Sequence, residues 1–380
     1  WEADIALSAG TAFSSVALMM GFAAWVAKRS AAAVWVVPLA FAASLYPILE
    51  TVAGEAYDSY FLPPTGFAGW LFQTTWAPQH VASASCVMLA SYLLLRLARS
   101  PSVLTLVVLS LVTVAGFESS TWVGGILFAA ASPVMAVVLL ADAPREKRLR
   151  LIGLLIVAAL LAAVLAYPFL HDEFLNAAGR NVGSPIAFSA VSVLDFPDSD
   201  ALRRALDVPA YWLALLVIEF PAIYITGTIS LVASLRSRAA AEPVMLMTKL
   251  LFAVALVSLL IAGYVTITFA DNNDLGWRAV LPAVFILTIY AATGLARWIA
   301  VPAPLMVGVS LALLLLALPR SIQIAAENLK GLPSASGKAF AASPDMWAAV
   351  RRHAGPAERV ANNPRDMAGM TPWPVNIVWA

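Results

Sequence analysis

Two short polar segments could carry chemistry in this chain of 380 residues. The first is Trp76-Ala-Pro-Gln-His80, in which Pro78 suits the first turn of a helix and places Gln79 and His80 at its N-terminus. The free N–H groups of a helix N-terminus favour anions, and a histidine there can bind a phosphate oxygen or exchange a proton. The alternative is an interfacial histidine that only anchors the helix end. Because no second histidine lies near His80 and the chain has a single cysteine, we predict no zinc site there.

The second segment is Ala270-Asp-Asn-Asn-Asp-Leu-Gly-Trp-Arg278, which concentrates carboxylates, amides and an arginine in a short loop. Asn273 and Asp274 lie in this loop, and Arg278 falls where the next apolar helix begins. A guanidinium at that position can form bidentate hydrogen bonds with a phosphate. The alternative is a local ion pair between Asp274 and Arg278, which are four positions apart.

Three further carboxylates are candidates for acid–base or ligand chemistry. Glu55 and Asp58 lie in an aromatic-rich loop that precedes His80. Glu219 stands inside an apolar run, two residues before Pro221, where its charged form would cost about 2.5–3.5 kcal/mol at the bilayer centre. It could form a proton or ligand site, or it could be a neutral carboxyl or one bonded to backbone groups that Pro221 frees.

The composition is that of a membrane protein. Hydrophobic residues make up 61% of the chain and charged residues 12%, against about 25% charged in an ordinary soluble domain. The net charge of +1 gives no nucleic-acid footprint, and the single cysteine, Cys86, cannot form a disulfide within the chain. The sequence contains no Walker-type loop, Gly-x-Ser-x-Gly or His-Glu-x-x-His motif, and we predict no metal site.

The apolar runs predict an all-α polytopic membrane protein with about ten transmembrane helices. The runs lie near 6–27, 31–52, 81–97, 102–117, 122–140, 151–170, 210–235, 244–269, 279–298 and 301–318. The fourth and fifth form a tight hairpin through residues 118–121. A transmembrane domain then covers 1–319, with outer loops at 53–79, 171–209 and 270–278, and an extracytoplasmic segment covers 320–380. Short interfacial helices, with aromatic rings at headgroup depth, are expected in the first loop.

The basic loops fix the expected orientation, because lysine and arginine gather on the cytoplasmic side. If every run crosses, all basic connections fall on one side: Lys28 and Arg29, Arg96 and Arg99, Arg145 to Arg150, Arg236 and Arg238, and Arg297. We therefore expect an integral protein of a bacterial cytoplasmic membrane with both termini extracytoplasmic. The start at Trp1 and the apolar stretch up to Ala380 suggest that both ends interrupt a longer protein.

These features resemble the GT-C superfamily of polytopic glycosyltransferases, which take sugars from polyprenyl-phosphate carriers. The architecture is similar, and Asn273-Asp-Leu-Gly-Trp-Arg278-Ala-Val-Leu-Pro282 looks like the loop in which many members place an arginine before an apolar Leu-Pro run. Trp76-Ala-Pro-Gln-His80 is similar to a Trp-x-Pro-x-His segment of bacterial members. In the family the catalytic acid usually lies in the first outer loop, after the first helix. In this chain only Glu2 and Asp4 stand at the start, before the first apolar run.

The resemblance implies transfer of a sugar from a polyprenyl phosphate to an extracytoplasmic acceptor. Glu55, Asp58 or an acidic residue outside this chain would deprotonate the acceptor hydroxyl, and His80 and Arg278 would stabilise the leaving phosphate. The remaining substrate-binding candidates are Asp274, Asn273, Gln79 and Glu219. A divalent cation is the one cofactor considered, and the expected partners are the polyprenyl-phosphate lipid, membrane lipids and other membrane subunits, without nucleic acid.

Two other classes of function stay open. The first is a non-catalytic subunit of a larger membrane complex. The second is a secondary transporter with Glu219 as its coupling carboxylate, which should contain paired broken helices. The sequence shows no such pair.

Overall fold

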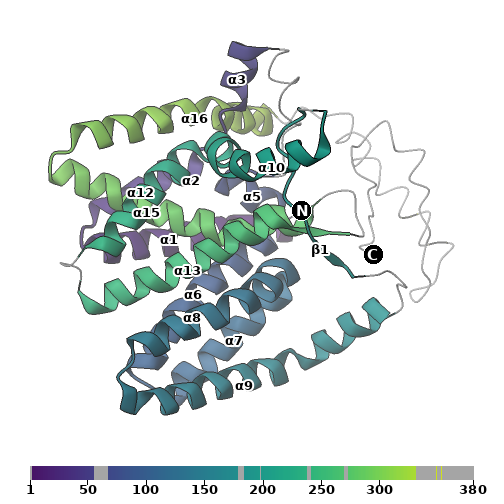
Figure 1. Ribbon diagram of the computed structural model, residues 1–380, viewed down its shortest axis with the longest axis vertical. Helices are drawn as coiled ribbons and strands as arrows, with labels where there is room; N and C mark the ends of the chain where they lie inside the picture. The colour runs from purple at the N-terminus through teal and green to yellow at the C-terminus, as the bar shows by residue number, and fades with distance from the viewer. Residues whose placement is uncertain are drawn as a thin grey trace. The chain divides into compact units, whose positions relative to one another are not determined.

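The computed structural model describes residues 2–54, 67–178, 184–196, 198–237, 241–268 and 273–330, together with Ala348 and Arg352 (Figure 1). The first helices are α1 (Glu2–Ala27), α2 (Ala31–Phe41), α3 (Tyr46–Ala53), α5 (Trp70–Trp76), α6 (Pro78–Arg99) and α7 (Val103–Ser119). Next come the π-helix η1 (Thr121–Leu127), α8 (Phe128–Asp142), α9 (Arg145–Ala178), α10 (Asp200–Ala210), the π-helix η2 (Tyr211–Leu215) and α11 (Leu216–Glu219). The last are α12 (Pro221–Arg236), α13 (Glu242–Tyr264), α14 (Asp274–Ala279), α15 (Leu281–Ala300) and α16 (Pro304–Lys330).

The apolar helices make the chain an integral membrane protein. Among the described residues, the helical stretches long and apolar enough to span a bilayer are Ala6–Ala27, Pro78–Arg99, Thr121–Asp142, Arg145–Leu175, Glu242–Tyr264, Asp274–Ala300 and Pro304–Ala326. Two bent helix pairs would raise the number from seven to nine. The remaining predicted run forms α7, a shorter apolar helix of 17 residues. The predicted count of ten is therefore not reached by length and composition.

Helix α15 is the centre of the bundle. Every residue from Leu281 to Ala296 is buried, as expected for a helix that is apolar all round. It packs against α1, α2, α12 and α13. Small residues allow the close approach to α12, since a Cβ added at Gly227 would lie 2.4 Å from the Leu287 carbonyl oxygen. At the end of α15, Arg297 donates to Ser234 Oγ (3.0 Å) and to the Val26 carbonyl (2.7 Å).

The helices α6, α7, η1, α8 and α9 form a second packed group, which Figure 1 shows beside α13. The predicted hairpin is confirmed, because Ser120 alone separates α7 from η1. The contact within the hairpin is tight, since a Cβ added at Gly124 would lie 2.2 Å from the Gly116 carbonyl carbon. Helix α9 packs on α7 and leaves most of its apolar surface uncovered by the protein, as a helix at the edge of a transmembrane bundle does.

Two of the predicted runs are broken rather than continuous. Helices α2 and α3 meet at an angle of 50°, and the α10–α11 stretch meets α12 at 116°. Pro221 begins α12 at a position that suits proline, so it marks the start of a new helix. The two breaks contact each other, because Leu45 N–H donates to the Ile218 carbonyl at 2.8 Å. The expectation that the chain contains no such pair is wrong.

A small sheet departs from the all-α prediction. Strands β1 (Ile186–Phe188) and β2 (Val265–Ile267) pair antiparallel, with Ala187 opposite Thr266. The strands come from two segments far apart in the sequence, and they join the 171–209 loop to the end of α13. Strands this short carry no periodic signal that a sequence reading could detect.

The chain divides into two compact units, Trp1–Ser321 and Ile322–Ala380. The helices, sheet and contacts above belong to the first unit, apart from the end of α16. The predicted domain boundary lies at residues 319 and 320. The outer position of the loops and of the C-terminal segment stays a prediction.

Candidate functional site

Helices α5 and α14 bring Arg278 against the Trp76 segment. The Arg278 Nη1 group donates to Gln73 Oε1 at 2.9 Å, across 205 positions of sequence. The guanidinium carbon lies 4.5 Å from the centre of the Trp76 ring, in a cation–π contact. Nη2 lies 3.5 Å from Asp274 Oδ1, which is the local pair considered from the sequence. Arg278 thus makes the local ion pair and a long-range set of contacts together.

The burial of Arg278 makes it unusual. The residue is 5% exposed, and its Nε is buried without a hydrogen-bond partner among the described residues. Asp274 is 40% exposed and only within ion-pair distance, so it offsets the burial of the charge incompletely. Because a buried cation is costly unless it is fully hydrogen-bonded, this guanidinium would be stabilised further by an anion.

His80 lies in the first turn of α6, shortly after Trp76 in the sequence. The prediction that Pro78 begins this helix is confirmed. His80 Nδ1 forms a hydrogen bond of 2.8 Å with Ser120 Oγ, and the same oxygen accepts from Val123 N–H at the start of η1. Helix α14, which carries Arg278, packs against η1, which directly follows Ser120. We call Gln73, Trp76, His80, Ser120 and Arg278 the arginine cluster.

Of the other predicted site residues, Asn273 lies near this cluster, and the rest lie on the protein surface, at a different site or outside the described residues. Asn273 caps α14, with Oδ1 accepting from Gly276 N–H at 3.2 Å and Nδ2 donating to the Val265 carbonyl, so it positions Arg278. Gln79 is exposed on the surface of α6. Glu55 and Asp58 lie outside the described residues.

Glu219 belongs to a different site, at the meeting of the two helix breaks. It is 1% exposed, and its Oε1 accepts a hydrogen bond from Tyr46 OH at 3.1 Å. Tyr46 opens α3 and Glu219 ends α11, so the bond joins the two broken helices. The Phe67 and Phe220 rings lie beside this point, with centroids 6.1 Å apart.

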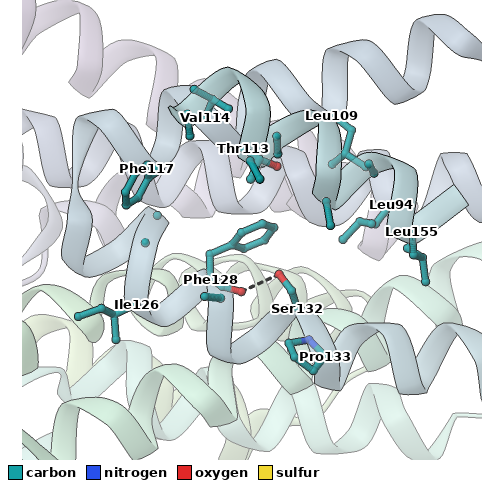
Figure 2. A pocket seen from close by; sticks show the side chains of 18 of the residues that line it. Leu94, Leu109, Thr113, Val114, Phe117, Ile126, Phe128, Ser132, Pro133 and Leu155 are labelled. Carbon is teal, nitrogen blue, oxygen red and sulfur yellow. Dashed lines mark hydrogen bonds between the residues drawn. The ribbon is translucent and has the colours of Figure 1, made fainter. Parts of the chain in front are cut away.

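An apolar cavity of about 720 Å³ opens between α7, η1, α8 and α9. In Figure 2, Thr113 and Val114 of α7 lie on one side and Phe128 and Ser132 of α8 on the other. The Ser132 hydroxyl donates back to the Phe128 carbonyl at 2.6 Å, which leaves the wall apolar. Thr121 and Gly124 of η1 also line the cavity, while Ser120, one residue earlier, binds His80. Ser120 of the arginine cluster therefore directly precedes the segment that lines the cavity.

Sequence reasoning missed Gln73, Ser120 and Tyr46 as site residues. Gln73 precedes Trp76 by three positions, the spacing of one helical turn, which is the signal that could have joined them. Trp70 also differs from expectation. It is fully buried, with Nε1 donating to Ser15 Oγ at 3.0 Å, so its ring packs inside the protein rather than at the surface.

The described residues contain no group of three or more histidine, cysteine, aspartate or glutamate side chains that could hold a metal ion. The arginine cluster brings together a guanidinium, an imidazole and an indole.

Comparison with known proteins gives similarity without an assigned activity. The chain is 30% identical over 399 aligned residues to the uncharacterized protein y4nK of Sinorhizobium fredii (strain NBRC 101917 / NGR234). The alignment includes the whole chain and 58% of that relative, so the chain spans less than two thirds of its length. Residues 336–380 match a family model described as the Y4nK C-terminal Rossmann-like domain. No solved structure matches.

Proposed function

We propose that this protein is a membrane glycosyltransferase of the GT-C type that takes a sugar from a polyprenyl-phosphate carrier. The observation that carries the proposal is the buried Arg278 guanidinium, with an unpaired Nε, on a helix that packs against η1. The η1 segment lines an apolar cavity and directly follows Ser120, the hydrogen-bond partner of His80. A polyprenyl phosphate has the matching chemistry, an anionic head on an apolar chain.

The head would bind at the arginine cluster. A phosphate there would accept from the Arg278 Nε and from His80, giving the buried charge the anion that Asp274 supplies only in part. The Trp76 ring, 42% exposed, offers a face on which a sugar can lie. The π-helical η1 supports this assignment, since such segments often occur at functional sites.

The isoprenoid chain would occupy the cavity between α7, α8 and α9. Its volume of about 720 Å³ lies within the range of about 300–1,000 Å³ seen for small-molecule sites, so it accommodates part of a long chain. Leu94, Leu109 and Leu155 line it, and so does Thr121, which follows Ser120 of the arginine cluster. A lipid entering laterally would thus place its head at η1 and its chain among the helices.

The transfer breaks the bond between the sugar C1 and the phosphate oxygen and forms a bond from C1 to the acceptor oxygen. The acceptor proton passes to a carboxylate, for which Glu55 and Asp58 remain the candidates. The electron pair of the broken bond stays on the phosphate, where Arg278 and His80 would stabilise the added charge. The chemistry needs positioning and electrostatics from this chain, and a divalent cation would serve only as an additional counter-charge.

The proposal also includes a membrane topology for the chain. If α7 and each bent pair also cross, the chain would make ten crossings, with the basic loops in the cytoplasm and both termini outside a bacterial cytoplasmic membrane. The acceptor would then be extracytoplasmic.

Binding of the lipid head tests the function directly. Purified protein in detergent is titrated with decaprenyl phosphate and with decaprenol, which lacks the phosphate. We expect the phosphate form to bind at least about tenfold more tightly, and R278K to lose nearly as much affinity as R278A, because lysine keeps the charge but not the planar fork. R203K is the matched control, since Arg203 is paired with Asp200 (2.7 Å) on α10, outside the cluster.

Equal binding of the alcohol and the phosphate, or an R278K protein that binds as the wild type does, would contradict the proposal. Transfer of radiolabelled sugar from decaprenyl-phosphate sugar then tests the catalytic step, and loss of transfer with retained lipid binding in Glu55 or Asp58 variants identifies the base.

A secondary transporter is the second candidate, favoured by the two broken helices that meet at Tyr46 and Glu219. Transporters place substrate and coupling-ion sites at such breaks. In that case E219Q would abolish proton-coupled uptake in vesicles while R278K left it intact, which is the reverse of the pattern expected for the transferase.

A further inference from the structure

A second cavity, of about 580 Å³, lies where α6 and α8 end and α9 and α13 begin. Figure 1 shows the junction of α8 and α9 at the opposite end of the bundle from β1. The cavity is therefore separate from the arginine cluster, whose Arg278 lies on α14, next to β2. Its floor is apolar, formed by Leu139, Leu151, Leu154 and Leu246, and its wall is charged.

The charges of the wall do not cancel. Its two carboxylates are already paired: Glu242 with Arg99, and Asp142 with Lys249, whose Nζ lies 3.4 Å from Oδ1. Lys147 and Arg150, the remaining charged groups of the wall, have no ion-pair partner among the described residues. Two positive charges thus remain on one side of an otherwise neutral and apolar cavity.

The local structure fixes these two cations in place. Lys147 and Arg150 are three positions apart in the first turns of α9, so they project from one face of the helix. Arg148, between them, turns away and donates from Nε to the Ala143 carbonyl at 3.1 Å, which holds the turn between α8 and α9. The N-terminus of this long helix adds its positive dipole end to the same place.

The depth of the cavity relates it to the bilayer. The candidate spans Pro78–Arg99 and Thr121–Asp142 end at its wall, and Arg145–Leu175 and Glu242–Tyr264 begin there. The leucine floor therefore lies at the edge of the apolar part of these spans, and the cations lie at the level of lipid headgroups. Basic pockets between helices at this level bind anionic lipid headgroups.

We infer that this cavity binds the phosphate of an anionic phospholipid, held by Lys147 and Arg150, with the acyl chains directed over the leucine floor. The inference is independent of the transferase proposal, because it uses none of the arginine cluster. A free organic phosphate offers the same headgroup chemistry, but it would leave the leucine floor uncovered. The lipid matches both parts of the cavity.

Native mass spectrometry of the full chain, stripped of lipid in detergent, tests the inference. The probes are phosphatidylglycerol, phosphatidylcholine and glycerol 3-phosphate. We expect one phosphatidylglycerol to be retained at least about tenfold more strongly than phosphatidylcholine. K147Q/R150Q should lose at least about tenfold of this retention, and glycerol 3-phosphate should not compete at equal concentration.

The matched control is R29Q/R236Q, which removes two exposed basic groups from other loops assigned to the same side. We expect its retention to stay within about twofold of the wild type. Retention by K147Q/R150Q equal to the wild type, or an equal loss in R29Q/R236Q, overturns the site. Competition by glycerol 3-phosphate as effective as by the lipid overturns the lipid in favour of a free phosphate. All the altered side chains are exposed, and thermal unfolding of each variant, with K147Q alone as the milder change, separates lost binding from lost folding.

Discussion

Tyr46 donates a hydrogen bond of 3.1 Å to Glu219 at the point where two broken helices meet, although the residues are 173 positions apart. The bond explains how a carboxyl that is 1% exposed is tolerated within an apolar bundle. The backbone contact from Leu45 to Ile218 strengthens the same junction. The two breaks therefore form one structural unit rather than two separate kinks.

Changes at Tyr46 and at Glu219 should destabilise the protein, and their effects on the free energy of unfolding should not be additive. We expect Y46F to lower the free energy of unfolding by about 1–3 kcal/mol, because a buried carboxyl loses a donor. In an E219L background, Y46F should cost at least about 0.5 kcal/mol less, as a double-mutant cycle measures for groups in contact. Thermal unfolding in detergent gives the values. Additive effects would mean that the bond contributes nothing, and a stable, fully active E219L would exclude a coupling role for the carboxyl.

Gln73 should contribute more to stability than its place in an aromatic loop suggests. It is fully buried and accepts from Arg278, so Q73M leaves part of a buried guanidinium without its acceptor. We expect a loss of about 1–3 kcal/mol in the free energy of unfolding. Q79M makes the same chemical change at an exposed site and should stay within about 0.5 kcal/mol of the wild type. Equal effects of the two changes would contradict the buried contact.

The hairpin of α7 and η1 should not tolerate a side chain at Gly124. A Cβ there would lie 2.2 Å from the Gly116 carbonyl carbon, so G124A must push the two segments apart. We expect a destabilisation of about 1–3 kcal/mol and a weakened His80–Ser120 contact, because Ser120 connects the two segments. G153A is the control, since nothing lies within 4 Å of an added Cβ on α9. A G124A protein as stable as G153A would show that the contact is loose.

Local features of the sequence predicted much of this structure. The apolar runs gave the helices, Pro78 gave the start of α6, and the spacing of Asp274 and Arg278 gave their ion pair. Each of these depends on neighbours in the chain, for which helix geometry sets the distances. The same is true of the hairpin at Ser120.

Contacts between distant segments could not be predicted in this way. An apolar run with Pro221 inside it reads as one helix, whereas Phe220 leaves the helical conformation (φ −135°, ψ 54°) and the chain bends by 116° there. Trp70 illustrates the same limit. Hydropathy does not distinguish a ring at the membrane interface from a buried ring such as that of Trp70, whose centroid lies 5.3 Å from that of Phe285. Periodicity reports which face is apolar, but not what covers it.

The predicted topology can be tested by labelling single cysteines from outside, after replacement of Cys86. We expect a membrane-impermeant reagent to modify F188C and K338C but not K147C. The reason is the gathering of basic loops on the cytoplasmic side. Phe188 lies in β1 and is 91% exposed, so a cysteine there is accessible. Modification of K147C in intact cells would reverse or break the assignment. Labelling of all three positions after permeabilisation is the control for reactivity.

Filling the apolar cavity should block the chain of a polyprenyl phosphate without touching its head. Ala162 lines the cavity on α9, so A162W would occupy part of the 720 Å³ that the lipid needs. L160W is the matched control, because Leu160 is on the same helix and 61% exposed, directed away from the bundle. We expect A162W to weaken decaprenyl phosphate binding at least about tenfold and to leave binding of inorganic phosphate unchanged, whereas L160W changes neither. Equal lipid binding by A162W and L160W would place the isoprenoid chain elsewhere, while loss of inorganic phosphate binding in A162W would mean that the tryptophan disturbs η1 and the arginine cluster itself.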